Sequence, residues 1–146
     1  MTRRKAIYLD AYGHSQPIPA ACVLGSTLVS GIIHGLDPAA GQDGGSLEAQ
    51  AALMFRRITA VLAAAGASTD DIVKLNVVMA DRSLRPAINA HWVAMFPDPA
   101  TRPVRQTVEA PLDNGKLLQC DFMAIVGDAL GDALGEALGE ALGEAR

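Results

Sequence analysis

Two charged side chains lie inside segments that otherwise have the composition of β-strands. Arg105 stands in the middle of PVRQTVEA and shares one strand face with Thr107 and Glu109, because side chains alternate along a strand. Asp121 stands in the middle of KLLQCDFMAIV. A guanidinium fixed on a strand can hold a carboxylate through two parallel hydrogen bonds. A nearby carboxylate can orient a water molecule, so the pair suffices for the hydrolysis of a small acid.

The two segments, 103–110 and 116–126, are separated by a predicted turn at 113–115, which reads Asp-Asn-Gly. We therefore expect them to be neighbouring strands, with Arg105 and Asp121 facing one pocket. On spacing alone, a structural ion pair between the two strands is the simpler interpretation. The sequence leaves both interpretations open.

No other arrangement predicts a metal or cofactor site. The three histidines, His14, His34 and His91, do not have metal-ligand spacing, and no phosphate-binding loop or dinucleotide fingerprint is present. Cys22 and Cys120 lie far apart without a partner ligand, which indicates two reduced core thiols in a cytoplasmic protein. We expect no metal and no cofactor.

Composition predicts one globular domain without nucleic-acid or membrane binding. The chain has 146 residues, of which 50% are hydrophobic. Residues 1–126 contain 11 acidic and 11 basic side chains, so this part lacks the basic surface typical of nucleic-acid binding. No apolar run is long enough to cross a membrane, and the basic start is not followed by the apolar stretch of a secretory signal.

The acidic excess lies in a repetitive C-terminal tail, 127–146, built from GDAL and GEAL tetrads. Leucine at every fourth position favours a helical stripe, whereas the glycine of each tetrad opposes a helix. The tail is either a helix that orders against a partner surface or an extension without a function of its own. We divide the chain into a domain at 1–126 and this tail.

Alternating strand and helix patterns predict an α+β fold. A long helix is expected from the cap Ser46 to Gly66, and a second one from the cap Ser83 to Pro97. Strands are expected at 5–9, twice within 22–33, at 72–80, at 103–110 and at 116–126. The strand at 72–80 is apolar enough to be buried on both faces. We expect a mixed sheet with both helices on one face and with partner subunits on the other.

Several segments in this order resemble the RidA/YjgF family of small enamine and imine deaminases. They are LVSGIIHGLDPAAG, ITAVLAAAGASTDDIVKLNVVMAD, INAHWVAMFPDP, PVRQTVEA and LLQCDFMAIV, and the similarity covers about residues 12–126. The resemblance implies the chorismate-mutase-like fold and a homotrimer with sites between subunits. It also implies the hydrolysis of 2-imino and 2-amino-enoic acids, such as 2-aminoacrylate, to 2-keto acids and ammonia without a cofactor.

The resemblance also implies roles for individual residues. Arg105 matches the arginine that grips the substrate carboxylate, and Asp121 falls where the family more often has a glutamate that positions water. Ser30 and Gly31 match the strand that lines the pocket. Asn89 matches an asparagine of the second helix. Thr107 stands near the substrate, where many members have cysteine.

His14 is the main departure, because the family commonly has tyrosine at this point. An imidazole can accept, donate or carry a proton near neutral pH. His14 therefore recognises a second polar group on a larger substrate, takes part in proton transfer to carbon, or merely replaces the tyrosine as a pocket wall. The resemblance, together with these departures from it, leaves three functions open: a general imine deaminase, a dedicated enzyme for a larger amino-unsaturated acid, and a trimer that binds a small carboxylate without converting it.

Overall fold

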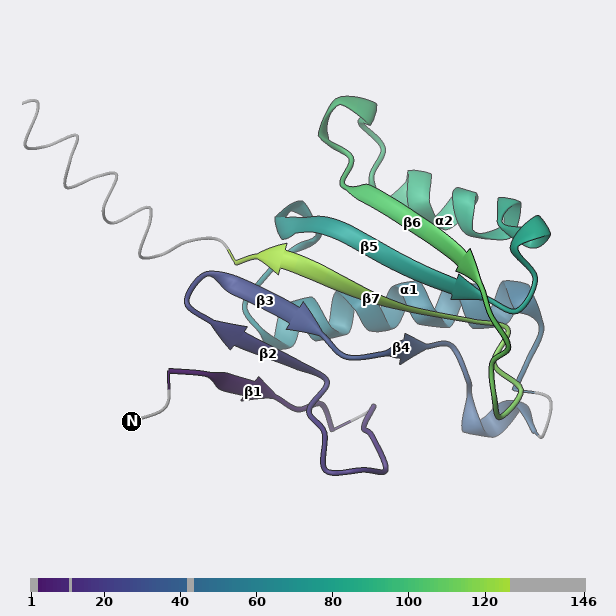
Figure 1. Cartoon of the computed structure of the whole chain (residues 1–146), viewed down its shortest axis with the longest axis horizontal. Helices are drawn as coiled ribbons and strands as arrows, with labels where there is room; N and C mark the ends of the chain where they lie inside the picture. The colour runs from purple at the N-terminus through teal and green to yellow at the C-terminus, as the bar shows by residue number, and fades with distance from the viewer. Residues whose placement is uncertain (1–2, 11, 42–43, 127–146) are drawn as a thin grey trace, which may run out of the picture.

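The computed structural model of the chain describes residues 3–10, 12–41 and 44–126, so the predicted tail at 127–146 lies outside the described residues. Within them, seven strands and two α-helices form one α+β unit (Figure 1). The strands are β1 (Lys5–Ile7), β2 (Ala21–Leu24), β3 (Thr27–Ser30), β4 (Ile33–His34), β5 (Ile72–Met79), β6 (Val104–Glu109) and β7 (Leu118–Ile125). The helices are α1 (Leu47–Ala64) and α2 (Pro86–Met95).

The sheet is mixed, as predicted, and has the order β1-β2-β3-β7-β5-β6, with the short β4 also paired to β7. Only β5 and β6 run parallel, and the other described pairs are antiparallel. Both helices lie behind the sheet in Figure 1. The short β4 was not predicted, because two residues carry no recognisable alternation.

The expectation that the last two strands are neighbours is wrong. Strand β5 lies between them, parallel to β6 and antiparallel to β7. The turn at 113–115 does form, with Lys116 N–H donating to the Asp113 carbonyl over 3.1 Å, but it lies in a connection that passes the end of β5. The inner side chains of β5, such as Leu75 and Val77, are fully buried, and this favours a central strand paired on both sides.

One face of the sheet carries the core and the other is open in the single chain. Strand β5 alternates between buried residues, such as Met79, and partly exposed ones, so its predicted burial on both faces is not met within one chain. The open face exposes Val29, Met123 and Ile125 by 46%, 39% and 43%. Apolar side chains gathered on one sheet face are typical of a surface that another molecule covers.

The two helices begin differently from each other. Ser46 caps α1 as predicted, since its hydroxyl accepts the Ala49 N–H over 3.1 Å. The second predicted start is wrong: Asp81, not Ser83, caps a single 3₁₀ turn at Arg82–Leu84. Helix α2 then begins at Pro86, whose fixed φ and missing N–H suit the first helical turn.

Gln50 is a fully buried polar residue that joins α1 to two loops. Its side-chain amide donates to the carbonyls of Gly45 and Gly115, each over 3.1 Å. Its side-chain oxygen accepts the Leu117 N–H over 2.9 Å. Gly35 lies so close to the backbone of Gln50 that an added Cβ would overlap with it. The start of α1, the end of β4 and the loop before β7 are therefore held together at one residue.

We predict that Gln50→Leu lowers the free energy of unfolding by about 2–4 kcal/mol, because a fully buried side chain loses its three hydrogen bonds to partly buried backbone groups. Chemical denaturation measures this change. The matched control is Gln16→Leu, at an exposed position, which should change the free energy by less than about 0.5 kcal/mol. Equal effects of the two substitutions would show that the Gln50 hydrogen bonds contribute nothing to stability.

Candidate functional site

Arg105 lies on the helix-facing side of the edge strand β6. Its Nη2 donates to Oδ1 of Asn89 on α2 over 2.8 Å. The guanidinium carbon stands 5.1 Å from the centre of the Trp92 ring, which adds a cation–π contact. Partial burial, together with the charge of Arg85, lowers the pKa of Arg105. The structure thus brings together two of the predicted residues, Arg105 and Asn89, and adds Trp92.

Two polar atoms beside this contact have no partner among the described residues. Nη1 of Arg105 and Oγ1 of Thr107 are both buried without a hydrogen bond. A buried polar group left in this way costs about 1–3 kcal/mol, and such groups are rare in native proteins. Thr107 follows Arg105 by two residues on the same strand face, so the two atoms without partners lie on the same side of β6.

Asp121 does not share a pocket with Arg105, and the two form no ion pair. Leu75 of β5 is the register partner of Arg105, whereas its neighbour Asn76 is the partner of Asp121. Because successive side chains point to opposite faces, Arg105 faces the helices and Asp121 faces the open side. Oδ1 of Asp121 instead accepts from the Asn76 side-chain amide over 2.9 Å. Both interpretations of this pair drawn from spacing are therefore wrong within one chain.

Two adjoining cavities lie at the other side of the molecule, between the segment 12–20, β4 and the loop before β7. The larger one, of about 650 Å³, is lined by His14, Gly31, Lys116 and Gln119 among others. The smaller one, of about 390 Å³, is lined by side chains that include Tyr12, His34, Arg57 and Asn114. Both cavities share Tyr12, Gly13, His34, Leu36 and Asn114 in their walls.

His14 lines the larger cavity with one edge of its ring fixed. Its Nδ1 accepts the Gln16 N–H over 3.0 Å, so the proton of the neutral ring is on Nε2, which is then a donor. Gly31 lines the same cavity. Ser30 does not: its hydroxyl donates to the Gly31 carbonyl over 2.9 Å and accepts the Phe122 N–H over 2.8 Å. Ser30 therefore stabilises the contact between β3 and β7.

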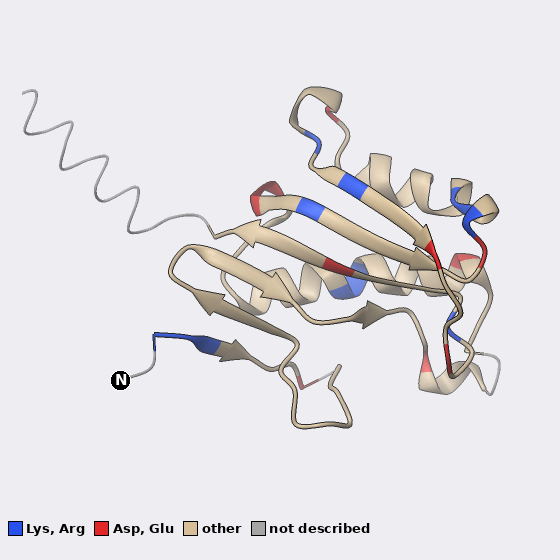
Figure 2. Ribbon diagram, in the orientation of Figure 1, with Lys and Arg blue, Asp and Glu red and all other residues tan. Residues whose placement is uncertain are grey.

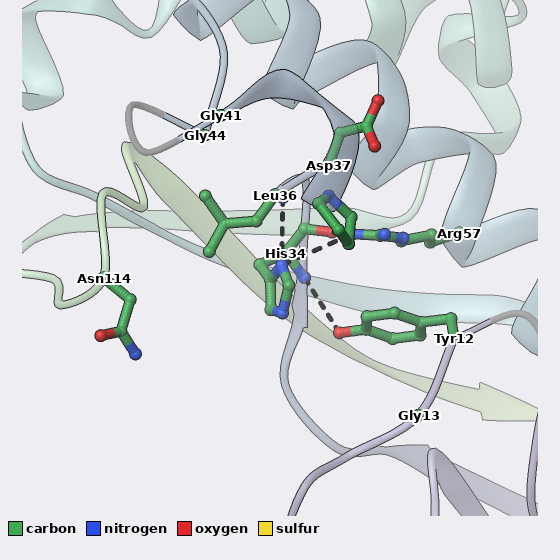
Figure 3. A pocket seen from close by; sticks show the side chains of 10 residues that line it. Tyr12, Gly13, His34, Leu36, Asp37, Gly41, Gly44, Arg57 and Asn114 are labelled. Carbon is green, nitrogen blue, oxygen red and sulfur yellow. Dashed lines mark hydrogen bonds between the residues drawn. The ribbon is translucent and has the colours of Figure 1, made fainter.

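Sequence reasoning missed a group of three side chains, Tyr12, His34 and Arg57, that lines the smaller cavity (Figure 3). The guanidinium carbon of Arg57 lies 4.3 Å from the centre of the Tyr12 ring, and its Nη1 donates to the His34 carbonyl over 3.0 Å. The Tyr12 hydroxyl donates to the Ile32 carbonyl and accepts the His34 N–H. These residues come from three distant segments, so no spacing along the chain connects them.

The electrostatic setting of this group keeps His34 neutral. Burial, and then the positive charge of Arg57, lower the pKa of His34 to about 4. Burial also raises the pKa of Tyr12 and lowers that of Arg57. Near neutral pH the group therefore holds one cation, a neutral imidazole and a neutral phenol.

Two further cavity residues were missed although the sequence held a signal for each. Gln119 shares the outward face of β7 with Asp121, and it is Gln119 that reaches the wall of the larger cavity. Asn114 has a left-handed φ of 58° in the predicted turn, a conformation that asparagine tolerates better than other residues with a side chain. From the sequence, this turn predicted only how the chain reverses. In the structure the Asn114 side chain lines both cavities.

Within residues 3–10, 12–41 and 44–126, no three His, Cys, Asp or Glu side chains are grouped so that they could hold a metal ion. Cys22 and Cys120 are free thiols, and complete burial raises the pKa of Cys120. No described helix has the length and apolar character needed to cross a membrane.

Comparison with known proteins places the chain in a family. Residues 8–126 match the family described as endoribonuclease L-PSP. The chain belongs to this family, which includes the RidA and YjgF proteins. None of the curated proteins matches the chain. The described α+β fold with its mixed sheet agrees with solved structures of L-PSP proteins.

Three solved structures show the extent of the similarity. RidA from the Antarctic bacterium Psychrobacter is 27% identical with a TM-score of 0.74, over 84% of this chain and 99% of that one. A protein from Rhodopseudomonas palustris described as a probable translation initiation inhibitor is 28% identical with a TM-score of 0.75, over 84% and 98%. A YjgF-family protein from Mycobacterium tuberculosis is 25% identical with a TM-score of 0.67, over 84% and 99%.

We predict that this L-PSP protein loses stability in acid through His34. Its pKa in the folded protein, about 4, lies below the ordinary 6.5, so between these values the unfolded chain binds more protons. The free energy of unfolding therefore falls as the pH drops from about 6.5 towards 4 and is unaffected by His34 above about pH 7. Denaturant titrations at several pH values measure this slope.

The matched variant is His34→Asn, whose side-chain oxygen can still accept the Leu36 N–H that His34 Nδ1 accepts over 3.1 Å. Asparagine does not titrate, so the variant should lose less stability over the same pH range. The same slope in both proteins would assign the acid sensitivity to other groups.

Proposed function

We propose that this L-PSP protein is a cofactor-independent hydrolytic deaminase of reactive 2-imino and 2-amino-enoic acids, such as 2-aminoacrylate, that yields 2-keto acids and ammonia. The observation that carries the proposal is the setting of Arg105. Its guanidinium is half-buried, held by Asn89 and placed over the Trp92 ring, and one terminal nitrogen lacks a partner. This is the arrangement expected of a residue that binds the carboxylate of a small acid.

The active site in this proposal is completed between copies of the chain in a homotrimer. Arg105 and the cavity with His14 lie apart within one chain, and Arg105 belongs to the edge strand β6. An assembly that covers the open sheet face would bring the edge of one copy towards the cavity of the next. The exposed apolar residues of that face support this assembly.

A 2-amino-enoic acid first becomes the 2-imino acid by gaining a proton at C3 and losing one from nitrogen. Little chemical assistance is needed after that, since such imines already hydrolyse in water. Arg105 fixes the carboxylate, water adds to the carbon of the C=N bond, and a carbinolamine forms. Its C–N bond then breaks, so that the oxygen stays on carbon as the ketone and the nitrogen leaves as ammonium. Positioning and electrostatic stabilisation carry such a step.

The cavity residues divide the remaining roles. With Nδ1 engaged by the Gln16 N–H, His14 presents an Nε2–H that donates to the substrate nitrogen or to the developing carbinolamine. The side-chain oxygen of Gln119 accepts from the attacking water. Asp121, which sequence reasoning favoured for the water, is hydrogen-bonded to Asn76 outside the cavity wall. In this proposal Asp121 positions β5 against β7.

The charge distribution favours a small acid over RNA as the ligand, although the family is described by an endoribonuclease name. Residues 1–126 contain equal numbers of acidic and basic side chains. In Figure 2 the Lys and Arg residues are interspersed with Asp and Glu along the elements rather than gathered on one of them. A nucleic-acid surface requires a basic patch.

We predict that the full-length protein competes with semicarbazide for 2-imino acids that an amino-acid oxidase generates. Arg105→Gln should lower kcat/KM by about 100-fold or more, because the carboxylate loses its bidentate, charged partner. Arg105→Lys should recover only part of it, since an ammonium cannot reproduce the fork. The matched control, Arg82→Gln at an exposed position, should stay within about twofold.

Wild-type protein that turns over no imine would contradict the deaminase. Carboxylate binding without turnover would indicate the third function, a trimer that binds a small carboxylate without converting it. Cleavage of RNA would indicate a nuclease.

We also predict that the cavity residues matter more for turnover than Asp121. His14→Phe and Gln119→Leu should each lower kcat by about tenfold or more, because each loses a hydrogen bond to the reacting atoms. His14→Gln should retain part of the activity, since its amide can donate from near the Nε2 position. Asp121→Asn, which keeps an oxygen for Asn76, should stay within about threefold in kcat. A larger loss of kcat in Asp121→Asn than in Gln119→Leu would show that Asp121, and not Gln119, positions the attacking water.

A further inference from the structure

We propose that the smaller cavity binds a second acidic group of the substrate, so that this protein acts on 2-imino dicarboxylic acids in preference to neutral ones. The inference rests on the proposed function for the first carboxylate, which Arg105 would hold. The second carboxylate would be held by Arg57, His34 and Asn114 (Figure 3).

Arg57 is the cation of this subsite. One of its terminal nitrogens, Nη1, is fixed by the His34 carbonyl, and Tyr12 covers one face of the guanidinium. Its Nε and Nη2 make no hydrogen bond with the described residues, and they are not among the buried atoms without partners. They are therefore open to a ligand, and the Tyr12 contact orients them in advance.

His34 supplies a donor because its tautomer is fixed. Its Nδ1 accepts the Leu36 N–H over 3.1 Å, with Nη1 of Arg57 a further 3.5 Å contact. A neutral imidazole whose Nδ1 accepts must carry its proton on Nε2. The remaining nitrogen therefore donates, and the ring lies in the wall that both cavities share.

The shared wall places this subsite next to the proposed reaction centre. Asn114, whose side-chain amide makes no hydrogen bond with the described residues, lines both cavities, as do His34 and the apolar Leu36. A substrate whose imine carbon lies near His14 can thus extend along Leu36 towards Arg57. A short carbon chain with a carboxylate at its end matches an apolar wall that leads to hydrogen-bond donors.

The neighbouring carboxylates do not cancel this preference. Asp37 also lines the smaller cavity, but its Oδ1 accepts the Ala39 N–H over 2.9 Å, and in Figure 3 the carboxylate points away from the His34 ring. The charge of Asp37 acts on Arg57 and opposes the lowering of its pKa. Asp37 is exposed, however, so water screens its charge more than that of the half-buried Arg57. Asp113, in the larger cavity, is paired with Lys116 over 3.1 Å.

The test measures the binding of unreactive acids by calorimetry with the full-length protein. Glutarate is compared with pentanoate and succinate with butanoate, so that each pair has the same carbon number and differs by one carboxylate. The wild type should bind one of the dicarboxylates about tenfold or more tightly than its partner, from charge-assisted hydrogen bonds to the second carboxylate. The preference should disappear in Arg57→Gln and persist in part in Arg57→Lys.

The matched control is Arg56→Gln, at the exposed neighbouring position of α1, which should keep the full preference. Asn114→Gly is a second variant that keeps the left-handed turn and removes only the amide, so a weakened preference there does not depend on the folding of the Arg57 variants. Equal binding of each pair by the wild type, no binding of any acid, or an unchanged preference in Arg57→Gln would overturn the inference.

The same proteins are then assayed with 2-imino acids from glutamate and from norvaline. A dicarboxylate preference in binding without any turnover would overturn the deaminase but leave the subsite standing. Turnover with equal kcat/KM for the two imines would overturn the subsite but leave the deaminase standing.

Discussion

The hydrogen bonds of the buried Gln50 determine where both cavities can form. This side chain satisfies the carbonyls of Gly45 and Gly115 and the Leu117 N–H, all of which lie in loops next to the cavities. Because Gly35 contacts the Gln50 backbone directly, the end of β4 is held at the same point. A side chain at Gly35 would overlap with the Gln50 backbone and displace the end of β4 from α1. The site therefore depends on one polar residue inside an otherwise apolar helix face.

The position of β5 is the second constraint. Its apolar inner row requires a central place in the sheet, and this separates β6 from β7. Arg105 consequently faces the helices, while Gln119 and Asp121 face the open side. Within a single chain, Arg105, the proposed partner of the substrate carboxylate, therefore lies apart from both cavities. The proposed trimer resolves this separation by bringing different copies together.

Arg105 and Arg57 are held in similar ways. Each guanidinium is half-buried, lies over an aromatic ring and has one terminal nitrogen fixed by an oxygen atom. Such a setting orients the remaining donors before a ligand arrives and so reduces the entropy lost on binding. Two sites of this kind suit a molecule with two acidic groups. This similarity links the proposed reaction to the proposed substrate class.

The sequence by itself predicted the α+β class, the long helix from Ser46 and an apolar strand at 72–80, and it singled out Arg105 as a candidate for carboxylate binding. These features follow from local periodicity, capping and residue chemistry, which act over a few residues. Strand order, the opposite faces of Arg105 and Asp121, and the group formed by Tyr12, His34 and Arg57 were decided by the tertiary structure alone. The side-chain contacts among them join residues 22, 23 and 45 positions apart, and the pairing of β3 with β7 joins Thr27 to Ile125. All of them depend on how the strands and α1 pack rather than on any pattern along the chain.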